Sequence, residues 1–184
     1  MDSLNKEQKK ILSFIAKDAI DNFIKDHSRK EYSIQDKRLL AKGGAFVTIH
    51  QKNKLRGCIG QIFPANYPLW MVIRDMAIEA AFNDPRFNPL SKKEFEEIEI
   101  EISVLSIPEK ISDWRKIELG KHGVIVRRGN NCGVFLPQVA VETGWGLEEF
   151  LSQLCSGKAC LNQDCYLDPK TEISIFTADI FKVA

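Results

Sequence analysis

The sequence predicts an α+β fold with antiparallel sheet. Two pairs of apolar segments are each separated by short turn sequences, which indicates two β-hairpins. The remaining strand-like segments are joined by helical segments of varied length, not by the regular strand–helix alternation of a doubly wound parallel sheet. The 184 residues allow one domain, or two small lobes, with an appreciable core.

The first half of the chain shows clear periodicity. Residues 4–26 place apolar side chains at helical spacing, and "GAFVTIHQ" (44–51) is typical of a strand. The turn "KNK" leads into the returning strand "LRGCI". A second helix is expected from about 67 to 83, and "DPRFNPL" forms a turn that ends it.

The second half begins with a short helix, for which Ser91 and Glu94 form a capping box. Residues 97–106 form the clearest strand, because isoleucines expected in the core alternate with glutamates expected at the surface. The later elements are expected to be a short helix "SDWRKIEL", a hairpin of "HGVIVRR" and "CGVFLP", two helices "PQVAVETGW" and "LEEFLSQLC", and a long strand over 173–182.

The charge balance argues against a nucleic-acid-binding protein. Lys and Arg number 26 and Asp and Glu 25, so the net charge is +1. Such a chain has no general field to attract phosphates, and we expect no tight binding to random DNA or RNA. The apolar runs are too short to span a membrane, and the polar "MDSLNKEQKK" lacks the apolar core of a signal peptide. A cytoplasmic protein without a membrane partner is the expectation.

Five cysteines favour free thiols in a reducing compartment over a disulfide framework. Cys155, Cys160 and Cys165 are evenly spaced, but the paired spacing of zinc ribbons is missing and no histidine lies nearby. Ordinary thiols are therefore favoured there over a metal site. The chain also lacks phosphate-loop and dinucleotide-binding fingerprints, so the sequence assigns no cofactor.

The hexapeptide "LRGCIG" (55–60) is the most unusual segment, because glycine weakens a strand unless backbone or ligand must come close. Strand alternation places Arg56, Cys58 and Gly60 on one face and the apolar residues on the core side. A guanidinium near the thiol would favour its thiolate form. The alternative is that Cys58 is a small buried side chain and that Arg56 pairs with the acidic strand.

Two further residues are candidates for acid–base chemistry. His122 lies between Gly120 and Gly123 at a strand entrance, where it could act as a general base. Glu142 follows on a short helix and could be its carboxylate partner. The alternatives are a histidine with a plain hydrogen-bonding role and a solvated helix glutamate.

These segments, together with "AIEAAFNDPRFNPL", "IEIEISVLS", "FLPQVAVETGW" and "FLSQLCSGKACL", resemble the AMME chromosomal region candidate family from about residue 10 onward. "LRGCIG" is the hallmark of that family. Family members usually read Lys-Ala-Gly-Leu where this chain has Cys160 in place of the glycine, and they commonly have tryptophan where it has Tyr166.

The resemblance implies a two-lobed architecture, in which an antiparallel sheet with flanking helices is joined to a smaller antiparallel lobe. The larger lobe would comprise residues 1–106 and 171–184, and the smaller lobe residues 107–170. The resemblance also implies a cleft between the lobes that the hallmark hairpin faces. We expect Arg56, Gly57, Cys58 and Gly60 to meet Pro137, Gln138 and Trp145 across this cleft, with His122 and Glu142 on its walls.

The resemblance does not assign a reaction. Prokaryotic members of the family are often encoded or fused with a Memo-like protein and a radical S-adenosylmethionine enzyme, which implies a shared modification pathway. In one hypothesis Cys58, His122 and Glu142 are catalytic and process a substrate, for example by acyl or alkyl transfer. In the other, the domain is a non-catalytic module that recognises a protein, peptide or modified intermediate. Oligomeric state is not predicted.

Overall fold

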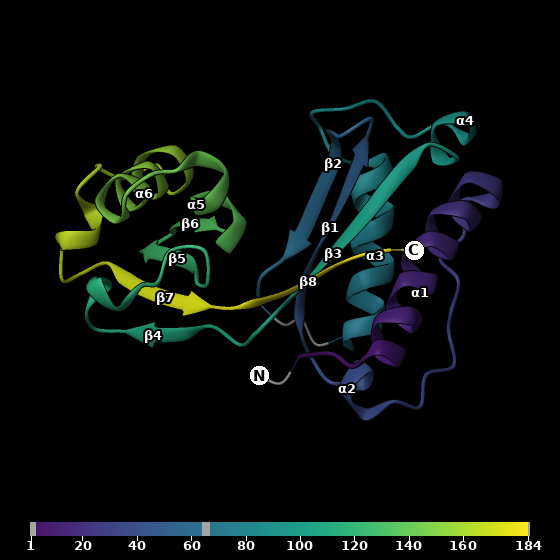
Figure 1. Cartoon of the computed structure of the whole chain (residues 1–184), viewed down its shortest axis with the longest axis horizontal. Coiled ribbons are helices and arrows are strands. Elements are labelled where there is room, and N and C mark those ends of the chain that lie inside the picture. Colours follow the sequence, from purple (N-terminus) through teal and green to yellow (C-terminus); the bar gives the residue numbers. More distant parts are fainter. Residues whose placement is uncertain (1–2, 64–66, 184) are drawn as a thin grey trace. The chain divides into compact units, whose positions relative to one another are not determined.

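The computed structural model describes residues 3–63 and 67–183 (Figure 1). The chain forms two compact units, which we call the first and the second unit. The first contains Met1–Ile107 and Asp179–Ala184, and the second contains Pro108–Ala178. The chain is therefore α+β, and each unit is built around its own four-stranded sheet.

The sheet of the first unit has the strand order β2-β1-β3-β8. Strand β1 lies between β2 and β3 and pairs with both in antiparallel fashion. The strands are β1 (Gly44–Gln51), β2 (Lys54–Gln61), β3 (Ile98–Leu105) and β8 (Ala178–Lys182). The helices are α1 (Lys6–Asp26), α2 (Lys37–Leu40), α3 (Leu69–Phe82) and α4 (Lys92–Phe95).

Helices α1 and α3 lie against one face of this sheet (Figure 1). Val47 and Ile49 of β1 and Ile102 of β3 are fully buried in the core that these helices cover. Because strand side chains alternate, Thr48 and its pairing partners Cys58 and Glu101 lie on the opposite face. The hallmark cysteine is therefore not part of the helix-covered core.

The alternation expected for the acidic strand is confirmed only in its first part, because Glu101 is half-buried and residues 102–105, including Ser103, are all buried. Ile100 and Ile102 are buried and Ile98 is half-buried, whereas Glu97 and Glu99 are exposed. The capping box of α4 is also present, since the Ser91 side chain accepts from the Glu94 amide and the Glu94 side chain accepts from the Ser91 amide. Two of the backbone donors at the start of this short helix are thereby satisfied.

The sheet of the second unit has the strand order β4-β7-β5-β6. Its core is formed by β5, β6 and the helices that follow, with Phe150 and Leu151 fully buried. The strands are β4 (Glu109–Ile111), β5 (Gly123–Arg128), β6 (Asn131–Phe135) and β7 (Glu172–Phe176). The helical segments are α5 (Pro137–Thr143), α6 (Leu147–Gln153), a π-helical turn (Leu154–Lys158) and 3₁₀ turns at Trp114–Lys116 and Cys165–Leu167.

The single strand expected over 173–182 in the larger lobe is wrong. The segment forms two strands, β7 and β8, separated at Thr177. Strand β7 pairs with β4 and β5 of the second unit, whereas β8 is a strand of the first sheet. One continuous segment thus contributes a strand to each of the two sheets.

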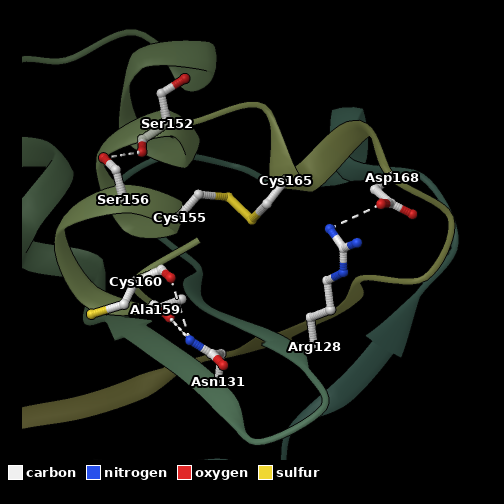
Figure 2. Close-up of a disulfide and its surroundings, with 9 residues drawn as sticks. All are labelled: Arg128, Asn131, Ser152, Cys155, Ser156, Ala159, Cys160, Cys165 and Asp168. Atoms are coloured by element: carbon white, nitrogen blue, oxygen red, sulfur yellow. Dashed lines mark hydrogen bonds and ion pairs between the residues drawn. A yellow bond between two sulfur atoms is a disulfide. The ribbon is translucent and has the colours of Figure 1, made fainter. Parts of the chain in front are cut away.

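The expectation of five free thiols is also wrong. Cys155 and Cys165 form a disulfide with Cα atoms 5.9 Å apart, and both residues are buried in the core of the second unit (Figure 2). Cys58, Cys132 and Cys160 are free. Over residues 3–63 and 67–183, no group of three or more His, Cys, Asp or Glu side chains is arranged to hold a metal ion.

Cys160 has a φ of 54°, in the left-handed region that glycine adopts most readily. Asn131 fixes this turn, because its side-chain amide donates to the carbonyl oxygens of Ala159 and Cys160 at 2.8 and 3.3 Å (Figure 2). The backbone conformation explains why glycine suits this position.

None of the helices in the described part of the chain is long and apolar enough to cross a bilayer.

Candidate functional site

The hallmark segment contains a β-bulge, which changes the face that its side chains occupy. Ile49 pairs with Gly57 and His50 pairs with Leu55, so Arg56 is the additional residue of the bulge. The regular alternation expected through "LRGCIG" is therefore broken, and Leu55 is 42% exposed instead of lying in the core. Ile59, beyond the bulge, packs against the core as expected.

The two glycines of the motif are required by close contacts inside the first unit. A Cβ atom on Gly57 would lie 2.1 Å from the carbonyl oxygen of Ala80, so strand β2 and helix α3 approach closely at this point. A Cβ atom on Gly60 would lie 2.2 Å from the ring of Phe46 on the neighbouring strand. Close approach was expected at both glycines, and its partners here are helix α3 and strand β1.

Asp84 and Arg86, in the turn after α3, bind the backbone of Cys58. The Cys58 amide donates to Asp84 Oδ2 at 2.9 Å, and Arg86 Nη2 donates to the Cys58 carbonyl oxygen at 3.3 Å. Arg86 also donates to both oxygens of Asp84, at 2.9 Å from Nε and 2.7 Å from Nη2. The hydrogen bonds from Arg86 hold the pKa of the buried Asp84 carboxyl well below its usual range.

The Cys58 thiol is not activated in the expected way. Burial raises its pKa, and the hydrogen bond with Thr48 and the charge of Arg86 offset only part of that rise. Its Sγ lies 3.3 Å from Thr48 Oγ1. The proposed thiolate stabilisation by Arg56 is wrong, because Arg56 instead forms an ion pair with Glu94 at 3.0 Å. That partner belongs to α4, not to the acidic strand considered as the alternative.

An open pocket of about 480 Å³ lies beside this network, between Arg56, Arg86 and the segment 85–88. The guanidinium carbons of Arg56 and Arg86 lie 5.8 and 5.5 Å from the centre of the Phe87 ring, within the range of cation–π attraction. Arg56 Nη2 also donates to the Asn88 carbonyl oxygen at 2.9 Å. The Arg56 hydrogen bond lowers the pKa of Glu94 to about 2.

The pocket combines an aromatic surface with two oriented cations. Neither the Nη1 atom of Arg56 nor that of Arg86 has a hydrogen-bond partner among the residues that the structure describes. Each guanidinium can therefore still donate to an incoming carboxylate or carbonyl oxygen. The two carboxylates already present neutralise most of the positive charge, so the pocket suits a polar group better than a multiply charged anion.

The candidates of the second unit have local structural contacts. His122 is 9% exposed, and its Nδ1 accepts from the Glu118 amide at 3.1 Å while its own amide donates to the Glu118 carbonyl oxygen at 2.9 Å. Trp145 packs against Phe135, with ring centres 6.2 Å apart. Glu142 is exposed on α5, Pro137 is buried at its first position, and Gln138 is half-buried.

The structure thus brings Arg56, Gly57, Cys58 and Gly60 together with Asp84, Arg86 and Glu94, which the sequence did not single out as site residues. The segment "DPRF" was interpreted only as a turn. The sequence did contain a signal for these residues. An aspartate and an arginine stand on either side of a proline, directly after a predicted helix. That His122, Pro137, Gln138, Glu142 and Trp145 share a crevice with the hallmark segment stays a prediction.

Comparison with known proteins assigns the family. The AMMECR1 family model matches residues 13–181, nearly the whole chain. The chain is a member of the AMMECR1 family. The resemblance found in the sequence is therefore confirmed.

The matches to relatives in this family cover most of each relative's own length. Protein NEQ441 of Nanoarchaeum equitans is 46% identical, and the match covers 83% of this chain and 89% of that protein. Protein MK0488 of Methanopyrus kandleri is 41% identical and is matched over 98% and 91% of the two chains. The crystal structure of the uncharacterized protein PH0010 from Pyrococcus horikoshii is 40% identical, covers 97% of this chain and 93% of its own, and superposes with a TM-score of 0.89. The PH0010 structure shares the fold of this chain, and the names of these three relatives state no activity.

Proposed function

We propose that this AMMECR1 chain is a recognition module, in which the pocket of Arg56, Phe87 and Arg86 binds a polar segment of a protein or peptide. The observation that carries the proposal is the engagement of Cys58. Its amide, its carbonyl oxygen and its thiol are all hydrogen-bonded, and burial raises the pKa of the thiol. Cys58 therefore acts as part of the framework that positions Arg86 beside Phe87.

The framework favours binding because it is organised before a ligand arrives. Asp84 fixes the Arg86 guanidinium through two hydrogen bonds, and Glu94 and Asn88 fix that of Arg56. Ordering a free arginine side chain on binding costs about 0.5–1.5 kcal/mol. Because these two side chains are already ordered, less of the free energy of each new hydrogen bond is lost, and the affinity is higher. The partners implied by the family resemblance are a Memo-like protein and a radical S-adenosylmethionine enzyme of a shared modification pathway.

The alternative is that Cys58 is a nucleophile, assisted by His122 and Glu142, which processes a substrate. That hypothesis requires an accessible thiolate, because the thiolate is the nucleophilic form. The Arg86 charge beside the thiol is the feature that favours it. Its effect on the pKa is smaller than that of burial, so the geometry supports binding better than catalysis.

Thiol labelling separates the two functions. We expect iodoacetamide at pH 7 to modify Cys58 more slowly than Cys132 and Cys160 in the native protein, because those two residues are exposed and Cys58 is half-buried with a raised pKa. Mass mapping of the labelled peptides gives the three rates. Faster labelling of Cys58 would contradict the proposal and restore the catalytic hypothesis.

Binding is tested by isothermal titration calorimetry with a purified Memo-like protein, the partner that the family resemblance implies. Phe87→Ala should weaken the complex by about tenfold or more, because a central aromatic contact is lost. Cys58→Ser should change affinity by no more than about threefold, since a hydroxyl can replace the thiol in the Thr48 hydrogen bond.

Tyr67→Ala is the control, because Tyr67 is an exposed aromatic residue of the first unit that lies before the N-terminal end of α3, whereas Phe87 follows its C-terminal end. It should leave the affinity unchanged. Equal losses for Phe87→Ala and Tyr67→Ala, or full affinity in Phe87→Ala, would remove the pocket from the interaction. Loss of binding in a folded Cys58→Ser variant would show that the thiol itself is needed.

A further inference from the structure

A second surface of the first unit has the properties of a binding groove. It has a volume of about 820 Å³ and lies between helix α1, Phe95 of α4 and strand β8. Among the described residues, the lining of this groove and that of the pocket of Arg56, Phe87 and Arg86 have no member in common. The groove therefore supports an inference that is independent of the proposed function.

Three phenylalanines supply the apolar surface of the groove. Phe14 of α1 is 58% exposed and contacts Tyr32 edge to face, with ring centres 6.2 Å apart. Phe95 and Phe181 are half-buried and pack against the margin of the core. Grouped exposed aromatic surface is uncommon on soluble chains and marks interaction sites.

Lysines surround this apolar surface. Five of them line the groove, namely Lys6, Lys9, Lys10, Lys17 and Lys182. Lys9 pairs with Asp179 and Lys182 pairs with Glu99. Over the two ranges for which coordinates are described, the other three have no carboxylate partner.

The two aspartates that line the groove are already neutralised. Asp18 accepts hydrogen bonds from Lys30 at 3.0 Å and from Tyr32 at 2.8 Å, and Asp21 pairs with Lys25. The groove therefore presents an excess of positive charge, although the whole chain carries only +1. Unpaired ammonium groups beside apolar surface favour a ligand that has both carboxylates and apolar side chains.

We propose that this groove binds an acidic amphipathic segment of a partner protein, with apolar side chains on Phe14, Phe95 and Phe181 and carboxylates beside Lys6, Lys10 and Lys17. The spacing of the lysines along α1 fits such a segment, because residues 6, 10 and 17 share one flank of the helix with Phe14. A nucleic acid fits less well, since the described residues of the lining include no arginine, and the three phenylalanines favour apolar side chains over a charged sugar–phosphate backbone.

The direct test uses the full chain and designed probe peptides in fluorescence anisotropy. The first probe is a labelled helix-forming peptide with Leu and Phe along one face and Glu on the other. The second keeps the apolar positions and replaces each Glu by Lys, and the third has the composition of the first in scrambled order. We expect the acidic amphipathic probe to bind at least about tenfold more tightly than either of the others, and its affinity to fall as salt is raised.

Two substitutions locate the interaction. Phe14→Ser should weaken binding of the acidic probe by about tenfold, because the most exposed aromatic contact is lost. Lys10→Glu should weaken binding of the acidic probe and strengthen that of the lysine probe, because it reverses the sign of one unpaired charge. Circular dichroism shows whether Phe14→Ser is folded, and Lys10→Glu alters only an exposed side chain.

The matched controls lie in the second unit. Leu167 has the same 58% exposure as Phe14, and Lys170 is an exposed lysine, so Leu167→Ser and Lys170→Glu make the same kinds of change outside the groove. Neither should alter binding. Equal effects of the groove variants and these controls would overturn the proposal.

Other occupants would also overturn it. Tighter binding of a single-stranded oligonucleotide than of the acidic probe would assign the groove to nucleic acid, and tighter binding of vesicles with anionic headgroups would assign it to a lipid surface. Concentration-dependent dimerisation that Phe14→Ser abolishes would assign it to a second copy of this chain. Absence of binding by the acidic probe at any salt concentration would refute the groove as a peptide site.

Discussion

Gly57→Ala tests the close approach between strand β2 and helix α3. The added Cβ atom would lie 2.1 Å from the carbonyl oxygen of Ala80. A carbon and an oxygen in contact normally stay about 3.3 Å apart, so strand and helix must separate by roughly 1 Å. The obstacle is backbone, which cannot turn aside as a flexible side chain can.

Two effects of opposite sign determine how much Gly57→Ala changes the free energy of unfolding. Overpacking of this kind costs about 1–3 kcal/mol, and separation of α3 from β2 also loosens the contact between Asp84 and the Cys58 amide. The smaller conformational entropy of alanine in the unfolded chain returns about 0.4–1 kcal/mol. We expect a net loss of about 2 kcal/mol in the free energy of unfolding of the first unit, or roughly 30-fold in its unfolding equilibrium constant. Gly57→Val, with a larger branched side chain, should lose more.

Pulse alkylation of Cys58 across a urea series measures this loss, because the half-buried thiol reports on the first unit alone. Gly157→Ala is the control, since a Cβ atom on Gly157 meets nothing within 4 Å and the residue lies in the second unit. It should leave the Cys58 labelling midpoint unchanged. A Gly57→Ala protein whose first unit unfolds within about 0.5 kcal/mol of the wild type would refute the packing argument.

Three further outcomes are expected. Because the pKa of Glu94 is lowered from 4.5 to about 2 in the folded protein, its ion pair with Arg56 contributes stability that is present above pH 4.5 and is lost as the pH falls towards 2. Urea unfolding of Glu94→Gln should therefore depend less on pH in that window, and an unchanged slope would contradict the assignment. Reduction of the disulfide between Cys155 and Cys165, ten residues apart, should destabilise the second unit by about 2–3 kcal/mol in melts with and without reductant. Cys160→Gly should stabilise the same unit by about 1 kcal/mol, since φ is 54° there, and a lower melting temperature would show that the thiol packs favourably.

Hydrophobic periodicity and turn residues predicted the strands whose bounds and faces depend on residues close to them in the sequence. The strand 44–51 has the expected bounds, because it is a buried apolar strand with a short turn after it. The alternation in the first half of β3 separated its buried from its exposed face correctly, whereas residues 102–105 are buried on both faces. Such signals succeed because one face of each strand must be apolar for the sheet to cover a core.

Features that depend on distant partners were not visible in the sequence. The segment 173–182 alternates apolar and polar residues over most of its length and contains no glycine or proline, so no turn signal separates β7 from β8. The bulge at Arg56 adds one residue to a strand, and a period of two cannot reveal where that residue lies. Evenly spaced cysteines likewise do not show which two point towards each other.

The candidate site was predicted in part for the same reason. The glycines of "LRGCIG" correctly indicated close approach, but the segment alone could not name Ala80 as the neighbour. Asp84 and Arg86 lie 26 and 28 residues from Cys58, and their role depends on helix α3 bringing the turn back to β2. Arg56 was expected beside the thiol, and the bulge directs it to Glu94 instead.

The order of the strands has a consequence for biosynthesis. Residues 108–178 form the second unit as one uninterrupted stretch, whereas the first sheet needs β8, which a ribosome produces only after that stretch. The second unit can therefore fold during translation while the first still waits for its outermost strand. Until then the outer edge of β3 is unpaired, including the Ile100 carbonyl that later accepts from the Val183 amide at 2.8 Å. A nascent or truncated chain lacking β8 would present that edge to other chains, so the interval before β8 emerges is when this protein is most exposed to aggregation and to chaperone capture.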